Sequence, residues 1–390
     1  MAQALETLLE VAFVGSAAGV LAVFVLYPLC VTAVGALRRP VEPPARSRAP
    51  SLSLLVALRN AETLAEAKVR NSLALDSDGP LELVFVSDGS SDRTAALLRA
   101  AGGERVRVLE LPEHQGKAHA LNQGAEVCRG EILVLSDADA MLAPDALRHL
   151  VARFADERVG GVCGQRVIHE EHGELTRAQG QYIAADSALK RAESRLGSVT
   201  SNDGKLYALR RALFRPIAPG ATDDLYSCLS VVEQGWRFVF EPRARAFIRT
   251  PSRNPAHELV RRRRIVSRSL RGIFLKRALL NPLHHGFFSV QLLVNKVLRR
   301  CLPLFLATLF VSALALAFGH AWARVALGLQ LAAYALALAH LLRARVRVPG
   351  LAPLASAAYY FCVGNLGTLL GLNDFVRGRE AVKWDPIKAG

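Results

Sequence analysis

The sequence predicts an α/β domain with a mostly parallel sheet, flanked by helices long enough to cross a membrane. Between residues 51 and 136, short apolar runs alternate with stretches of helical length, a pattern typical of parallel strands connected by helices. Elsewhere, four uncharged apolar runs each come close to the roughly 20 residues that cross a bilayer. These runs explain why 51% of the 390 residues are hydrophobic and only 21% are charged.

The first apolar run, residues 11–37, predicts a transmembrane helix. It is long for the apolar part of a secretory signal, and no clear small-residue cleavage site ends it, so we favour an anchor. Glutamates precede the run, whereas the linker after it, residues 38–50, is rich in arginine and proline. Because Lys and Arg favour the cytoplasmic side of a membrane, the region after residue 37 should be cytosolic.

Residues 301–373 predict three further transmembrane segments, at residues 301–318, 325–342 and 351–373. The arginines between the last two runs also fit the cytoplasmic side. Residues 374–390 would form a C-terminal tail. We therefore expect an integral protein of the inner (cell) membrane whose large middle region is cytoplasmic.

The middle region, residues 51–256, carries the predicted sheet. Its strands are expected at residues 53–58, 81–87, 106–111 and 131–136, with helices over 61–75, 91–102 and 117–130. Ligands of such sheets bind beyond the carboxyl ends of the strands. Polar residues gather at those ends, namely Arg59, Asn60, Asp88, Asp137 and Asp139.

Two aspartates follow the strand at 131–136 directly, in "EILVLSDADAML". Residues two apart in an extended chain point the same way, so Asp137 and Asp139 can offer both carboxylates to one cation. Mg²⁺ and Mn²⁺ favour a few carboxylates completed by water and phosphate oxygens. The alternative is that both residues only form a turn, for which Asp is well suited.

Three more polar positions have both a functional and a structural interpretation. Asp88, in "VSDGSSDRT", can serve a ligand loop or only a turn before a helix. Lys117, in "HQGKAHALNQG", can meet phosphate oxygens at a helix start or remain solvated. Of the pair Asp223 and Asp224, one carboxylate is accounted for by a helix N-terminus, and the second is left to act as a base.

The net charge of +15 is concentrated in one segment. Residues 257–300 hold nine Arg and two Lys against one Glu, directly before the apolar runs. Leu259, Val266, Leu270 and Phe274 recur in it at helical spacing, which predicts basic amphipathic helices at the anionic membrane surface, in contact with lipids. No nucleic-acid-binding signature accompanies the charge, so no nucleic acid is expected. The six cysteines have no paired spacing and indicate neither a zinc site nor disulfides.

Taken in order, the motifs "SDGSSDRT", "GKAHALNQG", "SDAD", "YALRRALF" and "TDDL" resemble those of glycosyltransferase family 2. These are inverting nucleotide-sugar transferases with a Rossmann-like catalytic fold called GT-A. The resemblance runs from about residue 51 to residue 273. The flanking apolar runs are similar to those of the membrane-embedded polysaccharide synthases of the hyaluronan, chitin and cellulose synthase group.

The resemblance implies a role for each matching position. Asp88 would contact the nucleotide, and Lys117 would lie near the nucleotide or its phosphates. Asp137 and Asp139 match the D-x-D element that holds a divalent metal, Mg²⁺ or Mn²⁺, and the donor diphosphate. Asp223 and Asp224 match the end of the T-E-D element, which makes Asp224 the candidate general base.

The basic helix carries one more match and one departure. "RRRRI" stands where processive synthases have Q-x-x-R-W, so Arg264 matches the donor-binding Arg, whereas Ile265 replaces the tryptophan beside the acceptor. An aromatic platform holds a sugar ring through its apolar face. Its loss predicts short or single-sugar products, unless Trp236 or Phe274 substitutes.

The expected function is transfer of a sugar from a nucleotide-diphosphate sugar, with uridine diphosphate usual among relatives, to a glycan or lipid-linked acceptor in polysaccharide biosynthesis. The alternatives are a single-sugar transferase that makes a glycolipid and a non-catalytic subunit of a glycan-export assembly. Export partners are a further expectation.

Overall fold

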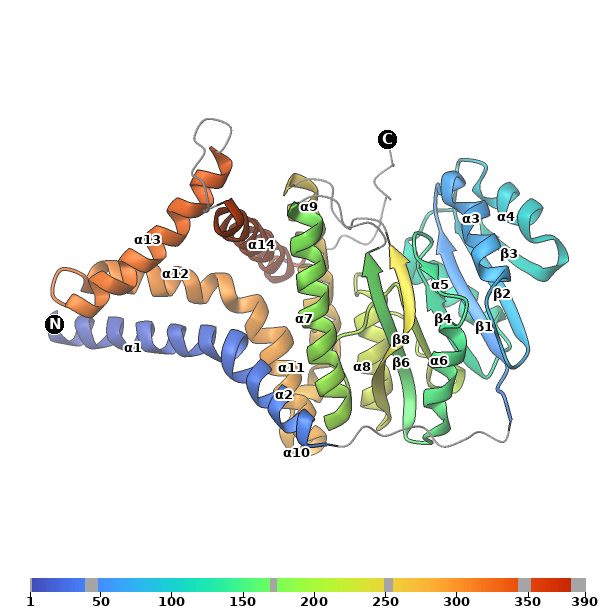
Figure 1. The fold of residues 1–390 in the computed structure, drawn as a ribbon, viewed down its shortest axis with the longest axis horizontal. Coiled ribbons are helices and arrows are strands. Elements are labelled where there is room, and N and C mark those ends of the chain that lie inside the picture. The colour runs from blue at the N-terminus through green and yellow to red at the C-terminus, as the bar shows by residue number, and fades with distance from the viewer. Residues whose placement is uncertain (1, 39–47, 169–173, 249–254, 343–351, 380–390) are drawn as a thin grey trace.

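The computed structural model describes residues 2–38, 48–168, 174–248, 255–342 and 352–379. An α/β body carries an arm of long apolar helices, and the N-terminus lies at the far end of that arm (Figure 1). The arginine cluster around residues 343–347 and most of the predicted tail lie outside the described residues.

The body is built on one sheet of eight strands, and the sheet is mixed. In spatial order the strands are β3 (Val106–Leu111), β2 (Leu81–Asp88), β1 (Leu52–Leu58), β4 (Ile132–Ser136), β7 (Leu206–Arg210), β6 (Val159–Ile168), β8 (Arg237–Ile248) and β5 (Met141–Leu142). The four strands expected from the sequence form the parallel half. Strand β7 then runs antiparallel to both of its neighbours.

Helices cover both faces of the sheet, as the alternating pattern predicts. One apolar cluster lies under α3 (Glu62–Leu73), α4 (Thr94–Gly102) and α6 (Ala146–Ala152). The second lies under α5 (Lys117–Val127) and α8 (Asp223–Glu233). The second cluster continues into α9 (Pro255–Leu275) and α11 (Phe287–Leu292), so the core of the body extends toward the arm.

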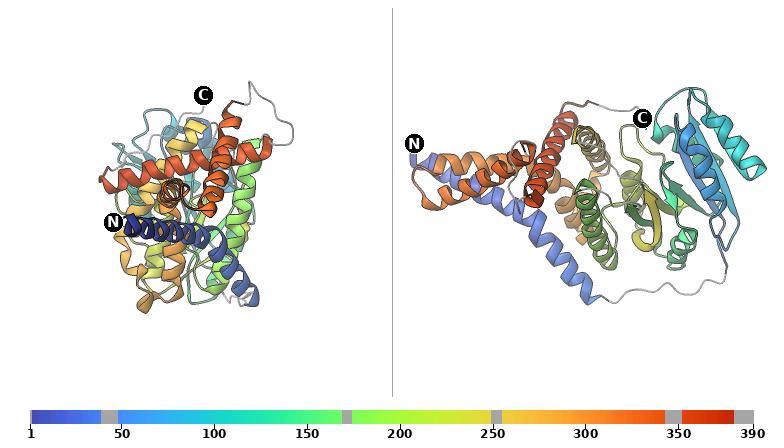
Figure 2. Two further views of the ribbon diagram at one scale, coloured as in Figure 1. Left: turned by 90° about the vertical axis from the view of Figure 1, so that its left-hand side faces the viewer. Right: turned by 45° about the horizontal axis from the view of Figure 1, so that its top comes forward.

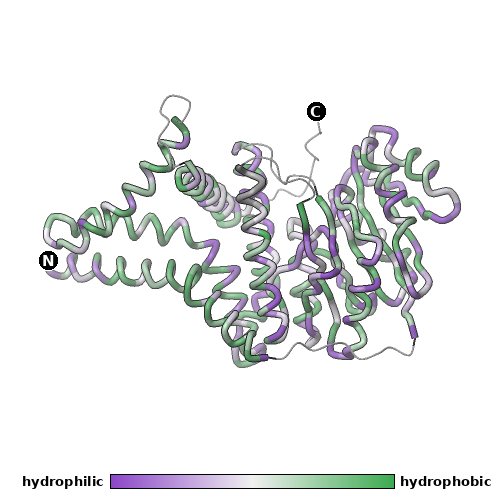
Figure 3. Tube along the Cα trace, viewed as in Figure 1, coloured by the Kyte–Doolittle hydropathy of each residue, from purple (hydrophilic) through white to green (hydrophobic). Residues whose placement is uncertain are grey.

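The arm contains three helical segments long and apolar enough to cross a membrane, at Gln3–Leu37, Phe287–Leu316 and Ala321–Leu341 of the described chain. The first comprises α1 (Ala2–Leu21), a π-helical turn and α2 (Tyr27–Leu37); the second ends in α12 (Arg299–Leu316); the third is α13 (Ala321–Leu341). Figure 2 shows α1 and α12 side by side. Figure 3 shows the arm as predominantly hydrophobic.

The segmentation differs from the expected one in two places. The second candidate span begins at Phe287 rather than at residue 301, because α11 continues through a π-helical turn into α12 and carries three basic residues within it. The apolar run 351–373 forms α14 (Ala352–Val376), which is not among the three candidate spans. Helix α14 lies against α9, at the junction of arm and body (Figure 1).

Helix α9 is basic and amphipathic, as expected, but its apolar residues are not all open to lipid. Val266 and Leu270 are buried in the protein, whereas Phe274 is exposed. The two helices approach so closely that a Cβ on Gly371 of α14 would lie 2.5 Å from the Arg263 carbonyl oxygen. Arg263 also forms an ion pair of 2.5 Å with Asp374. Contact with α14 therefore accounts for the buried face.

The remaining elements connect the arm to the body. Helix α7 (Glu174–Leu196) stands at the edge of the body that faces the arm, and short α10 (Pro282–His285) precedes α11 (Figure 1). Tyr27 and Val31 of α2 pack on Leu189 and Ala192 of α7. The six cysteines are all free.

Candidate active site

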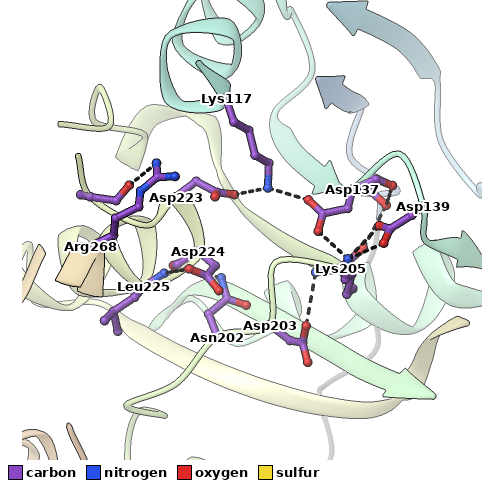
Figure 4. Close-up of polar contacts among 12 residues, drawn as sticks. Lys117, Asp137, Asp139, Asn202, Asp203, Lys205, Asp223, Asp224, Leu225 and Arg268 are labelled. Carbon is purple, nitrogen blue, oxygen red and sulfur yellow. Dashed lines mark hydrogen bonds and ion pairs between the residues drawn. The ribbon is translucent and has the colours of Figure 1, made fainter. Parts of the chain in front are cut away.

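The carboxyl ends of β1, β2 and β4 meet at one edge of the sheet because these strands are parallel. Asp137 follows β4 there. Since β7 is antiparallel to β4 and pairs Leu206 with Ser136, the residue before β7, Lys205, lies beside Asp137. The first turn of α8 brings Asp223 and Asp224 to the same place (Figure 4).

Two lysines link the acidic residues of the site. Lys117 Nζ lies 2.5 Å from Asp137 Oδ1 and 2.8 Å from Asp223 Oδ2. Lys205 Nζ lies 3.0 Å from Asp137 Oδ2 and 2.7 Å from Asp139 Oδ1 (Figure 4). Both predicted aspartate pairs therefore meet across Lys117, at the start of α5 where Gly116 has a φ of +99°.

The ion pairs fix the charge states around Asp137. Burial alone would raise the pKa of Asp137, but Lys117 and Lys205 outweigh it and hold that pKa far below its usual range. Burial would likewise lower the pKa of Lys117, and its two aspartates instead hold it well above its ordinary value. Asp137 is thus an anion at neutral pH, as a metal ligand must be.

A buried lysine is hydrogen-bonded to both ends of the turn that carries Asp137 and Asp139. Lys68 of α3 is fully buried, and its Nζ donates to Ser136 Oγ at 2.8 Å and to the Ala140 carbonyl oxygen at 2.5 Å. Burial lowers the pKa of Lys68 to about 7, although Asp137 and Asp139 favour its charged form. These bonds tie both ends of the turn to α3, so we assign Lys68 a positioning role.

Asp224 differs from the other acids of the site because no basic side chain among the described residues bonds to its carboxylate. Its Oδ1 accepts a hydrogen bond of 2.7 Å from the Leu225 N–H, and Asn202 donates to its backbone oxygen at 3.2 Å. Burial, followed by the nearby charge of Asp223, raises the pKa of Asp224 to about 6. A carboxylate with a pKa near the working pH is suited to accept a proton. No side-chain cap from Thr222 is seen at this helix start.

Asp88 has a different environment from the one expected. Its carboxylate is buried and accepts bonds from the Gln115 N–H at 3.0 Å and the Gly116 N–H at 2.9 Å. His114 Nδ1 lies 2.8 Å from it. In this arrangement Asp88 fixes the loop before Lys117, and contact with a nucleotide stays a prediction. At the start of α4, the Asp92 carboxylate accepts a hydrogen bond of 3.0 Å from the Thr94 N–H.

Arg264 lies on α9, the helix that also carries Arg268 and Arg261. It makes no hydrogen bond or ion pair with another described side chain, and the negative charge of Asp137 opposes the lowering of its pKa. Burial, then the neighbouring Arg268 and Arg261, lower that pKa to about 10, so Arg264 stays charged. Arg268 of the same helix donates to the Ala221 carbonyl oxygen at 2.9 Å (Figure 4).

A cavity of about 420 Å³ has Asp224 in its wall. Its walls come from β6, α7, the loop 201–203, α8, α9, the α11–α12 helix and α14. Ile265 lines it, and so do Tyr182 and Tyr360. Trp236 and Phe274 are not part of the wall; Trp236 contacts Arg210, and Phe274 contacts Phe375. Among the described residues, the aromatic side chains of the wall are therefore the two tyrosines.

Sequence reasoning missed Lys68 and Lys205. Lys205 lies in "SNDGK", directly before the strand "LYALR", but only the antiparallel placement of β7 brings it to Asp137. Lys68 is one of several charged residues of α3, and the sequence carries no signal that its side chain is the buried one.

The fold and the site define a class of protein. The sequence model of glycosyl transferase family 2 matches residues 53–217 of the chain. The match covers β1 to the segment before α8, and thus Lys117, Asp137, Asp139 and Lys205.

Particular relatives are similar over that domain. Poly-β-1,6-N-acetyl-D-glucosamine synthase of Staphylococcus aureus (strain COL) is 27% identical over 207 residues, covering 51% of this chain and 50% of the relative. β-Monoglucosyldiacylglycerol synthase of Trichormus variabilis is 32% identical over 168 residues, covering 42% of this chain and 36% of the relative. The chain thus spans about half the length of the first relative and about a third of the second.

The whole fold has a counterpart among solved structures. A mannosyltransferase from Pyrobaculum calidifontis, in complex with GDP-Man and Mn²⁺, superposes with a TM-score of 0.68 at 21% identity. The superposition covers 97% of this chain and all of the other. The expected GT-A fold with flanking apolar helices is therefore confirmed.

Proposed function

We propose that the chain is a membrane-bound, inverting glycosyltransferase that moves a sugar from a nucleotide-diphosphate sugar to a glycan or lipid-linked acceptor. The observation that carries the proposal is the meeting of both aspartate pairs at one edge of the sheet, with Asp224 left free of any bonded cation. A subunit that only anchors or conducts a glycan has no need of this arrangement. The catalytic body would face the cytoplasm, where nucleotide sugars are made.

The residues at the D-x-D element fit a divalent cation. One ammonium group, Lys205 Nζ, already contacts carboxylate oxygens of both Asp137 and Asp139, so a single cation can be shared by the two. Hard oxygen ligands suit Mg²⁺ or Mn²⁺, with the remaining positions left to water and donor phosphates. The P. calidifontis relative was solved with Mn²⁺, which supports this choice. When bound, the cation would stabilise negative charge on the leaving diphosphate.

The chain's own groups divide the rest of the reaction. Lys117 and Arg264 add positive charge near the departing diphosphate, in a site where such charge is worth more than in water. Asp224 takes the proton from the acceptor hydroxyl as its oxygen attacks the anomeric carbon. Attack from the face opposite the leaving group inverts that carbon. A general base of this kind typically contributes about 10² to 10⁴ in rate.

The size of the product distinguishes the two enzymatic hypotheses, a transferase that makes a polymer and one that adds a single sugar. Ile265 lines the cavity in place of an aromatic platform, which favours short or single-sugar products. The two sequence relatives include one polymer synthase and one glycolipid synthase by name. Membranes containing the chain should be incubated with radiolabelled nucleotide sugars and Mg²⁺ or Mn²⁺, and the labelled product sized. Absence of transfer from every donor would contradict the proposal.

A further inference from the structure

The cavity beside Asp224 has an excess of positive charge. Seven basic side chains line it against four carboxylates, an excess of three. Four of the seven have carboxylate partners in its wall: Arg166 with Asp203, Lys190 with Asp186, and Arg261 and Arg262 with Glu258. The three that remain are Lys296, Arg299 and Arg300.

These three residues, the cationic triad, lie on one helix at spacings of three and four residues, so they share a face of that helix. Arg300 donates to Ser269 Oγ at 2.9 Å, and Arg299 donates to Asn295 Oδ1 at 3.4 Å. The Lys296 ammonium makes no hydrogen bond or ion pair within the described chain. None of the three meets a described carboxylate. Like charges gathered in a partly buried place are costly unless an anion joins them.

The position of the cationic triad in the fold restricts which kind of anion can reach it. The triad lies on Phe287–Leu316, a candidate membrane span that is uncharged from residue 301 onward. Tyr360 and Thr368 of the apolar helix α14 form another part of the wall. A ligand that enters beside these helices can keep hydrocarbon chains in the membrane while its polar group occupies the cavity. Arg and Lys are the usual partners of phosphate oxygens.

Asp224 lines the same cavity and restricts the ligand further. A base is needed there only if the attacking group is a hydroxyl, since a phosphate oxygen carries no proton to remove at neutral pH. The ligand must then present a hydroxyl to Asp224 and a phosphate to the basic side chains.

We propose that the acceptor is a lipid that carries a phosphate group and a free hydroxyl group, with the phosphate bound by Lys296, Arg299 and Arg300. This inference rests on the proposed function and specifies its acceptor. The hydroxyl oxygen forms the new bond to the anomeric carbon as the bond from that carbon to the diphosphate breaks. The bonding electrons leave with the nucleoside diphosphate, and the hydroxyl proton passes to Asp224.

The first test measures the binding of three probe molecules to the unaltered full chain in neutral detergent. The probes are phosphatidylglycerol, which has both groups, diacylglycerol, which has the hydroxyl without the phosphate, and glycerol 3-phosphate, which lacks the lipid. Phosphatidylglycerol should bind at least tenfold more tightly than diacylglycerol, because one charge-assisted phosphate contact is worth about that factor. It should also bind at least tenfold more tightly than glycerol 3-phosphate, because burial of its acyl chains against the apolar helices adds to the binding free energy. Equal binding of diacylglycerol would overturn the proposal, and equal binding of glycerol 3-phosphate would reduce the site to one for soluble phosphate.

Variants assign the effect to the cavity. Lys296→Gln should weaken phosphatidylglycerol binding about tenfold, whereas Arg300→Lys, which keeps the charge, should change it less. Arg277→Gln is the matched control, because Arg277 is an exposed basic residue of the same segment outside the cavity wall. An equal loss in the control would mean general attraction to the surface and would contradict the proposal. Nucleotide-sugar binding is measured in parallel: its retention in every variant verifies folding, and its absence from the unaltered chain would count against the proposed function instead.

Discussion

Asp224→Asn tests the assignment of the base, and the pH dependence of the unaltered chain gives the expected size of the effect. With a pKa of about 6, Asp224 is ionised in about 90% of molecules at pH 7 and in about 10% at pH 5. Because only the ionised carboxylate accepts a proton, turnover should fall roughly ninefold between these pH values. An aspartate with its ordinary pKa of 3.8 would remain mostly ionised at pH 5 and would give a nearly flat profile.

The assay is release of nucleoside diphosphate with saturating donor and acceptor. Asp224→Asn should lower turnover by about 10² or more and abolish the pH step, while donor binding by calorimetry stays nearly unchanged. Asp223→Asn is informative as a second variant, because the charge of Asp223 contributes to the raised pKa of Asp224. It should move the midpoint of the profile to lower pH. An active Asp224→Asn protein, or a flat profile between pH 5 and 7, would refute the reasoning and return Asp224 to a helix start.

Three further outcomes are expected. Asp139→Asn should weaken donor binding and its dependence on Mg²⁺ or Mn²⁺, because an amide is a poorer ligand for a hard cation; unchanged metal dependence by calorimetry would remove Asp139 from the metal site. Lys68, whose folded pKa of about 7 lies below its ordinary 10.5, binds its proton more weakly in the folded than in the unfolded chain. The melting temperature should therefore rise from pH 7 toward pH 10, and Lys68→Met should flatten that rise; identical slopes would contradict the buried lysine. A reporter active only outside the cytoplasm, fused within residues 153–173, should be silent, and activity there would reverse the topology.

The parallel half of the fold could be predicted because each of its strands is a short apolar run followed by a helix. The half formed by β7, β6 and β8 could not, since these strands lack that alternation and their mixed antiparallel and parallel pairing depends on long-range contacts. Because long-range strand pairing could not be predicted, only some residues of the site could be found from the sequence. Asp137, Asp139 and Lys117 follow predicted strands or begin predicted helices, whereas Lys205 reaches the site only through the pairing of β7 with β4.

In the basic segment 257–300, the pattern of charges predicts a helix but does not identify what covers its apolar face. The sequence correctly indicated an amphipathic helix over 255–275, but it could not show that α14, about a hundred residues later, covers part of the apolar face. Glycines at 364, 367 and 371 permit this close contact. Packing of α9 against α14 therefore replaces part of the lipid contact expected from the sequence, and Ile265 of α9 lines the cavity.

The configuration of the transferred sugar tests the central claim most directly, namely a single displacement in which the D-x-D side holds the leaving diphosphate and Asp224 activates the acceptor. A nucleotide sugar that supports transfer should be used with ¹³C at the anomeric carbon, and the product configuration read by NMR without further processing. We predict a configuration opposite to that of the donor. A product that retains the donor configuration, or failure of every nucleotide sugar to serve as donor, would contradict the account.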